Sequence, residues 1–116
     1  MGSTKKYFYT QRHLQLSDLC KALGHPARIS IIKILSENRQ LNCEAIYSKL
    51  KLSKSTISRH CKVLHENGIM GYEVVGNNCF YHIDNSRLDA ITDFIDTINV
   101  TPIPLTNQVY YPANRP

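Results

Sequence analysis

A three-residue link between two amphipathic segments is the feature that most constrains what this chain can fold into. Asn42 can cap a short helix over residues 43–50, and Ser53 can cap another over 54–66, which leaves only residues 51–53 between them. Two helices with so short a link are typical of a helix-turn-helix. The sequence therefore predicts this motif in the middle of the chain.

The segment after these two helices alternates apolar and polar residues, which predicts a β-hairpin. The alternation runs through residues 69–83, and we expect the turn at Asn77-Asn78. One face of the hairpin should pack against the helices, and its members are Tyr72, Val74, Tyr81 and Ile83. The opposite face carries Glu73, Val75, Phe80 and His82. A helix-turn-helix followed by such a hairpin has the order of a winged helix.

Helical periodicity also predicts elements on both sides of this centre. We expect one helix over residues 4–23, with or without a break near Ser17, and a second over 26–37. Towards the other end, Ser86 and Asp89 have the spacing of a capping box that opens a last helix. Its apolar stripe has the intervals of a helix-pairing seam and consists of Leu88, Ile91, Ile95 and Ile98.

Together these elements predict a mainly helical fold with a small β-hairpin, in the order α-α-α-α-β-β-α. Residues 1–100 should form one winged-helix domain, followed by a flexible, proline-rich tail over 101–116. No apolar run approaches the ~18–20 residues that span a bilayer, and no signal-peptide core follows the start, so we expect a cytosolic protein. The chain has no catalytic motif such as GxSxG or HExxH and no phosphate-binding glycine loop, which argues against an enzyme.

The distribution of charge indicates a polyanionic partner on one side of the molecule. Residues 1–83 hold 12 Lys and Arg against 5 Asp and Glu, whereas residues 84–99 hold one Arg and four Asp. A basic body with an acidic late segment is typical of a protein that presents one positive face. The sequence therefore predicts a basic surface on one of its helices.

The helix expected over 54–66 has one polar, basic face. Its inner side gathers Ile57, His60, Cys61 and Leu64, and its outer side carries Ser55, Ser58, Arg59 and Lys62. The outer side has no apolar side chain and no acid before Glu66, whereas a face that only confers solubility usually mixes both signs of charge. This composition favours a face built for an anionic surface.

Such a face fits the major groove of DNA. Short hydroxyl side chains let a helix backbone approach a groove ~12 Å wide, and Arg59 can then pair with a guanine edge while Lys54 and Lys62 meet phosphates. The small, polar hairpin tip over 76–78 should lie near the adjacent minor groove or backbone. The expected DNA contacts are Lys54, Ser55, Thr56, Ser58, Arg59, Lys62, Asn77 and Asn78.

Three stretches of the chain form a specific combination: KALGHPARI at residues 21–29, LSKSTISRHCKVL at 52–64 and NGI at 67–69. Together they closely resemble the ArsR/SmtB family of winged-helix transcriptional repressors, over about residues 17–99. The resemblance implies a homodimer that binds an inverted-repeat operator and represses transcription until an inducer, often a metal or metalloid ion, releases it. It also implies that Lys54, Ser55, Ser58 and Arg59 face the DNA.

The terminal helices carry apolar stripes that one small domain cannot fully cover, which independently predicts a dimer. The residues expected in its interface are Leu16, Leu19, Leu88, Ile91, Ile95 and Ile98. A two-fold axis between these helices would place two DNA-reading helices about one turn of the duplex apart, roughly 34 Å.

The residues predict no particular cofactor, and a metal or metalloid inducer is left open. The family's arsenic or cadmium site uses a Cys-x-Cys pair, of which this chain has only Cys43, a weak candidate ligand. The family's zinc-type site draws Asp and His from the last helix, and residues 86–99 contain no His, although the carboxylates there leave a site for a harder ion open. The other cysteines are expected to pack against apolar neighbours, and they are Cys20, Cys61 and Cys79.

Two alternative functions stay open on the sequence alone. A winged helix can also bind protein, here through its tail or its acidic last helix, and two thiols from different elements could form a redox-sensing link. Strong salt dependence of binding would favour DNA over a protein partner. Mass spectrometry that finds no linked cysteines after mild peroxide treatment, together with no loss of operator binding, would exclude the redox sensor.

Overall fold

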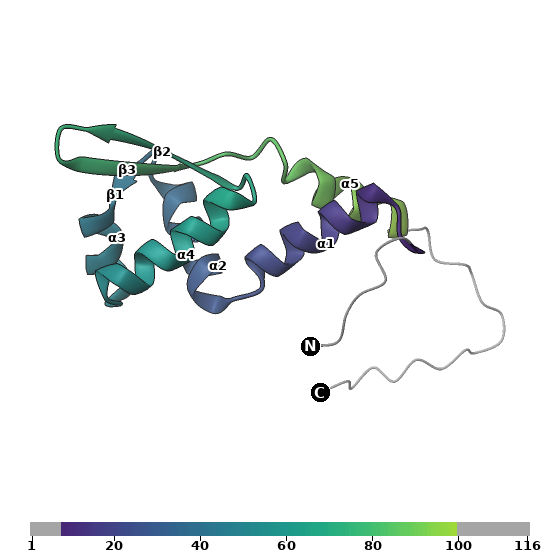
Figure 1. Ribbon diagram of the computed structural model, residues 1–116, viewed down its shortest axis with the longest axis horizontal. Helices are drawn as coiled ribbons and strands as arrows, with labels where there is room; N and C mark the ends of the chain where they lie inside the picture. The colour runs from purple at the N-terminus through teal and green to yellow at the C-terminus, as the bar shows by residue number, and fades with distance from the viewer. Residues whose placement is uncertain (1–7, 100–116) are drawn as a thin grey trace, which may run out of the picture.

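The computed structural model describes residues 8–99, which form five helices and three short strands (Figure 1). In chain order they are α1 (Gln11–Leu23), α2 (Pro26–Glu37), β1 (Leu41–Asn42), α3 (Cys43–Leu50), α4 (Lys54–Glu66), β2 (Met70–Val75), β3 (Asn78–Ile83) and α5 (Asp89–Ile98). This is the mainly helical winged-helix order expected from the sequence, with one added strand. The tail predicted over 101–116 lies outside the described residues.

Side-chain caps fix where the two central helices begin. The Asn42 side chain accepts a hydrogen bond from the backbone N–H of Ala45 (2.9 Å), and the Ser53 hydroxyl accepts one from the N–H of Thr56 (3.2 Å). Each bond satisfies a backbone donor that has no partner inside its helix. Both predicted starts of the helix-turn-helix are therefore confirmed.

The first helix is shorter than its sequence pattern predicts. The Thr10 side chain accepts a hydrogen bond from the N–H of His13 (3.1 Å), so α1 begins at Gln11 and residues 8–10 lie before it. The helix is continuous through Ser17, where a break had been left open. The predicted start at residue 4 is wrong because apolar periodicity does not locate a helix end, whereas a capping side chain does.

The hairpin, here called the wing (residues 70–83), turns one residue earlier than expected. Val75 pairs with Asn78, so the turn consists of Gly76 and Asn77, and Gly76 has a φ of +61° that suits glycine. Strand pairing shifts by two residues relative to the predicted turn. A shift of two leaves every side chain on its predicted face, because the side-chain period of a strand is also two.

Only the base of the wing packs against the helices. Tyr81 and Ile83 pack on the core as expected, but Val74 is 66% exposed and Tyr72 is 48% exposed because the wing extends beyond the helices. A third strand that the sequence did not predict covers the other edge of β3, where Leu41 pairs with Tyr81. Two residues are too few to show an alternating pattern.

The core lies between α1, α2, α3, α4 and the base of the wing, with Leu19 and Ala22 contributed by α1 (Figure 1). Its fully buried side chains are Ile31, Ile46, Ile57, Cys61, Leu64, Ile69 and Met70. Three of them, Ile57, Cys61 and Leu64, come from the predicted inner side of α4. Their burial fixes the rotation of α4 about its own axis, so its opposite side must face solvent.

The last helix begins later than the predicted capping box would place it. The Asp84 side chain accepts hydrogen bonds from both the backbone N–H (3.1 Å) and the hydroxyl (2.7 Å) of Ser86, and these bonds hold the pKa of Asp84 below its usual value. Ser86 therefore donates its hydrogen bonds to Asp84 and does not cap a helix, and α5 starts at Asp89 without a side-chain cap. The capping-box prediction is wrong for this reason.

At the end of the molecule opposite the wing, α5 lies beside α1 (Figure 1). Leu88 and Ile91, which were expected at a dimer interface, are partly buried against the core of their own chain. Farther along α5, however, Phe94 is 41% exposed, Ile95 is 49% exposed and Ile98 is 56% exposed. None of the helices within residues 8–99 is long and apolar enough to cross a membrane.

Candidate nucleic-acid interface

The outer side of α4 is an open surface of cations and short hydroxyls. Its exposed side chains are Lys54, Ser55, Ser58, Arg59 and Lys62. These are the predicted contact residues, apart from Thr56, which is half-buried. On the opposite side of the helix, Ile57, Cys61 and Leu64 are at most 1% exposed. We call the exposed set the outer face of α4.

Thr56 belongs to the helix cap. The Ser53 hydroxyl donates a hydrogen bond to the Thr56 hydroxyl (2.8 Å) while accepting one from the Thr56 N–H, and it lies 3.2 Å from the Ser55 hydroxyl. Ser55 and Ser58 are therefore the short side chains that a groove would meet first. The N-terminal end of α4 adds a partial positive charge to this surface.

We expect Ser53→Ala to lower the free energy of unfolding by about 1 kcal/mol, because the Thr56 N–H would lose its partner. Urea unfolding followed by circular dichroism, at fixed protein concentration, measures the change. Ser36→Ala is the matched control, since that exposed hydroxyl donates to the Lys33 carbonyl inside α2 and caps nothing. Equal changes in the two variants would show that Ser53 does not cap α4.

A salt bridge that the sequence did not reveal joins α4 to α3. The Nζ atom of Lys54 pairs with Oε2 of Glu44, which lies in the first turn of α3. The hydrogen bond to Glu44 and its negative charge raise the pKa of Lys54. No spacing rule connects these positions, because they lie on different helices and meet only through the turn between them.

Two histidines join the inner edge of α4 to the start of α2. The His60 ring contacts the His25 ring at a tilt of 50° with 4.5 Å between centroids, and Nδ1 of His25 accepts a hydrogen bond from the Ala27 N–H (3.0 Å). Burial lowers the pKa of His60, and nearby positive charges lower it further. Arg28 and Arg59 carry those charges, and the coulombic interaction with the His25 ring acts in the same direction. The His60 ring is thus neutral at neutral pH and supports packing, as expected.

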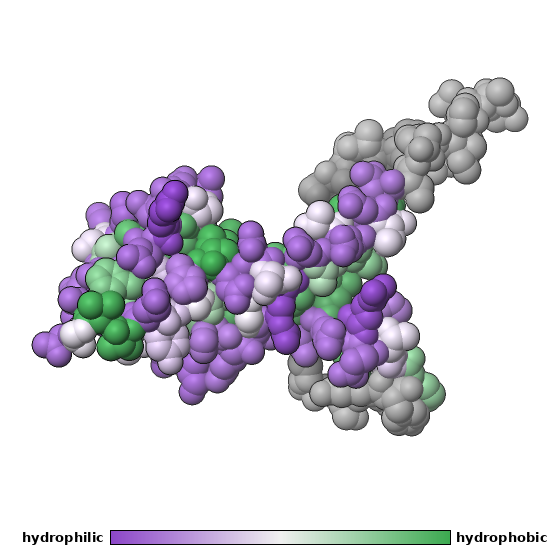
Figure 2. All heavy atoms as spheres, turned by 90° about the horizontal axis from the view of Figure 1, so that it is seen from above, coloured by the Kyte–Doolittle hydropathy of each residue, from purple (hydrophilic) through white to green (hydrophobic). Residues whose placement is uncertain are grey.

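The wing tip is polar at its turn and apolar just before it. Asn77 and Asn78 are exposed, as a contact with DNA requires, while the neighbouring Val74 and Val75 are 66% and 63% exposed. Figure 2 shows hydrophobic atoms at the end of the molecule where this tip lies. A cavity of about 340 Å³ separates the wing from α4 and has Lys62 and Tyr72 in its lining.

The described cysteines do not assemble a metal centre. Burial raises the pKa of the Cys61 thiol to about 12, and burial also raises that of Cys43, so both stay protonated at neutral pH. Within residues 8–99, no three or more His, Cys, Asp or Glu side chains are grouped so that they could hold a metal ion. Cys61 packs in the core as predicted, whereas Cys20 is exposed, which contradicts its expected packing.

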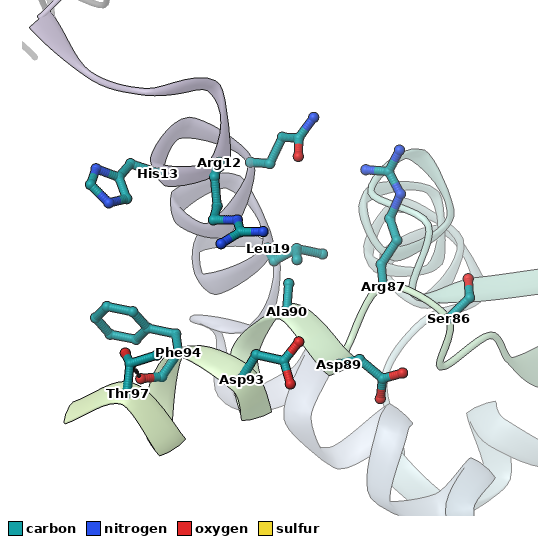
Figure 3. Close-up of a pocket in the computed structure, with 11 residues that line it drawn as sticks. Arg12, His13, Leu19, Ser86, Arg87, Asp89, Ala90, Asp93, Phe94 and Thr97 are labelled. Carbon is teal, nitrogen blue, oxygen red and sulfur yellow. Dashed lines mark hydrogen bonds between the residues drawn. The ribbon is translucent and has the colours of Figure 1, made fainter. Parts of the chain in front are cut away.

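A pocket of about 610 Å³ lies between α1 and α5. Figure 3 shows Ala90 of α5 pointing toward Leu19 of α1, with Arg12 and Asp93 projecting into the space between the helices. Leu19 was expected at a dimer interface, but it is 3% exposed in the core of its own chain, which leaves it little surface for a partner. Leu16 is half-buried.

Comparisons with known proteins agree with this architecture. The family model described as "Bacterial regulatory protein, arsR family" matches residues 25–70. A helix-turn-helix-type transcriptional regulator of Methanocaldococcus jannaschii is 31% identical over 88 residues, which cover 76% of this chain and 99% of the relative. The arsenical resistance operon repressor of Staphylococcus xylosus is 30% identical over 87 residues, which cover 75% and 83% of the two chains.

Solved structures share the fold. HlyU from Vibrio cholerae aligns with a TM-score of 0.65 at 22% identity, over 78% of this chain and 98% of that one. An ArsR-like transcriptional regulator from Rhodococcus aligns with a TM-score of 0.68 at 19% identity, over 77% and 83%. At these identities the structural likeness establishes the fold alone.

Proposed function

The chain belongs to the ArsR family of bacterial regulatory proteins, and we propose that it represses transcription by binding an inverted-repeat DNA operator as a homodimer. Members of this family are DNA-binding transcriptional regulators and not enzymes. The observation that carries the proposal is the outer face of α4, where cations and short hydroxyls are exposed while the apolar side is buried. A repressor works where its operator lies, so we also propose a cytoplasmic location.

In this proposal α4 is the recognition helix. Its outer face enters the major groove, where the Arg59 guanidinium pairs with a guanine edge and Lys62 meets a phosphate. Asn77 and Asn78 at the wing tip lie near the minor groove or backbone beside it. The exposure of all four side chains supports these roles.

The dimer of this proposal pairs the terminal helices. Ile95 and Ile98 present apolar surface on α5 that the chain's own core does not cover. Adding a second copy along α1 and α5 would bury this surface and would place two recognition helices on one side of a duplex. The supporting observation is that this exposed stripe lies on α5, at the end of the molecule opposite the wing (Figure 1).

Selection of duplexes from a random library by the purified protein tests the function. We expect enrichment of an inverted repeat whose half-site centres are about 10 base pairs apart or a multiple of that, since two related helices read successive major grooves. Failure to enrich any sequence would contradict the proposal. The selected operator is then the DNA ligand with which the variants are titrated.

We expect Arg59→Ala to weaken operator binding by about 1–3 kcal/mol and to relax base preference at one position in each half-site. Lys62→Ala should instead weaken binding to all duplexes alike, because a phosphate contact carries no sequence information. Titrations with the operator and with a random duplex separate the two effects. Unchanged affinities of Arg59→Ala for both duplexes would exclude this docking of α4.

A metal or metalloid inducer stays a proposal that rests on the family alone. Within residues 8–99 no three or more donor side chains are grouped so that they could hold a metal ion. Titrating Zn(II), Cd(II), As(III) and peroxide against the operator complex tests whether any of them releases DNA.

A further inference from the structure

An ion pair joins the first turns of the two helices in the helix-turn-helix. Lys54 is the first residue of α4, Glu44 lies in the first turn of α3, and their side chains form a salt bridge. Both side chains are 60% exposed, so solvent ions and a docked duplex can reach the pair. The pair therefore belongs to the same open surface as the outer face of α4.

Lys54 differs from the other cations of this face because a carboxylate already neutralises it. Within residues 8–99 the ion pairs are Lys54–Glu44 and Lys33–Glu37, so Arg59 and Lys62 have no ion-pair partner there. The proposed phosphate contacts of α4 are thus of two kinds. Lys62 is ready to bind an anion, and Lys54 must first leave Glu44.

A DNA phosphate and the Glu44 carboxylate offer the Lys54 ammonium group the same kind of anionic oxygen. We propose that Glu44 competes with DNA phosphate for Lys54 and thereby lowers the affinity of the protein for every duplex, whatever its sequence. This inference rests on the proposed function, because it requires that the outer face of α4 docks on DNA. It assigns Glu44 a part in setting DNA affinity, although Glu44 itself contacts no DNA.

The competition should be visible in the salt dependence of binding. A free lysine that neutralises a phosphate releases about 0.9 counterion from the duplex. When Lys54 leaves Glu44 for a phosphate, the freed carboxylate remains beside the duplex and retains cations there, which offsets most of this release. Removing the carboxylate should therefore make the dependence of affinity on salt steeper.

The test is Glu44→Gln, which keeps the size of the side chain and removes its charge. We expect affinity for the operator and for a random duplex to rise by the same factor, about 2- to 30-fold at low salt for the two subunits together. The slope of log affinity against log salt should steepen by about two for the dimer.

Glu37→Gln is the matched control. It makes the same change in net charge and breaks the other ion pair, Lys33–Glu37 (3.5 Å), on a helix that carries none of the proposed DNA contacts. We expect it to change affinity by less than about twofold and to leave the slope unchanged. When Lys54 is already replaced by Ala, adding Glu44→Gln should raise affinity by no more than Glu37→Gln does.

A gain that persists without Lys54, or a gain no larger than that of Glu37→Gln, would overturn the proposal. Thermal unfolding of each variant distinguishes a purely structural role, since such a role would change the Tm without changing the salt slope. If Arg59→Ala weakens operator binding while Glu44→Gln has no effect, only this inference fails. If the unmodified protein binds no DNA, the proposed function fails as well.

Discussion

Replacing both Ile95 and Ile98 with glutamate should convert the protein from a dimer into a folded monomer and lower operator affinity by about 10²–10⁴-fold. Both side chains are about half exposed in one chain, so the variant should fold. In a dimer the same positions would be buried, and four unpaired carboxylates would have to be desolvated. A monomer binds only one half-site, so it also lacks the high effective concentration that a dimer has for the second half-site once the first is bound.

Analytical ultracentrifugation measures the oligomeric state, and titration with the selected operator measures the affinity. Ile29→Glu is the control, because Ile29 on α2 is 56% exposed, as Ile98 is, but lies outside the proposed interface. It should leave the protein dimeric. A double variant that still sediments as a dimer, with unchanged operator affinity, would show that α5 does not form the interface.

Raising the salt concentration from about 50 to 200 mM should lower operator affinity by about a hundredfold or more. The physical reason is that each phosphate neutralised by the protein releases a condensed counterion, and two copies of α4 make several such contacts. Fluorescence anisotropy with a labelled operator at a series of salt concentrations gives the slope directly.

Lysine variants locate the origin of this slope. Lys62→Ala should reduce its magnitude by about two for a dimer. Lys33→Ala should leave the slope nearly unchanged, since Lys33 is paired with Glu37 on α2. A weak salt dependence, together with affinity for a protein partner, would instead favour the alternative of a winged helix adapted for protein docking.

The helix-turn-helix was predictable because local interactions define it. Asn42 and Ser53 each cap a helix through a backbone N–H three residues away, and the sequence places both caps correctly. The two faces of α4 were predictable as well, since its apolar residues recur at helical spacing and its polar residues fall between them. The structure confirms their burial and exposure.

The features that the sequence did not predict depend on contacts between distant segments, or on local hydrogen bonds that compete with the predicted ones. Leu41 joins the sheet only because β3 passes beside it, and the short pattern around it carries no signal. Ser86 has the spacing of a capping residue, but its N–H and its hydroxyl donate hydrogen bonds to the Asp84 side chain instead. Cys20 belongs to an apolar stripe and is nevertheless exposed.

The sequence by itself determined the order of the helices and the wing, the starts of the central helices and the polar face of α4, because caps and periodicity act over a few residues. Only the tertiary structure decided which side chains from different helices meet. In the tertiary structure Glu44 pairs with Lys54 and Leu19 lies in the core. Ile95 and Ile98 of α5 stay about half exposed. Such contacts depend on how whole helices pack, and no local spacing encodes that packing.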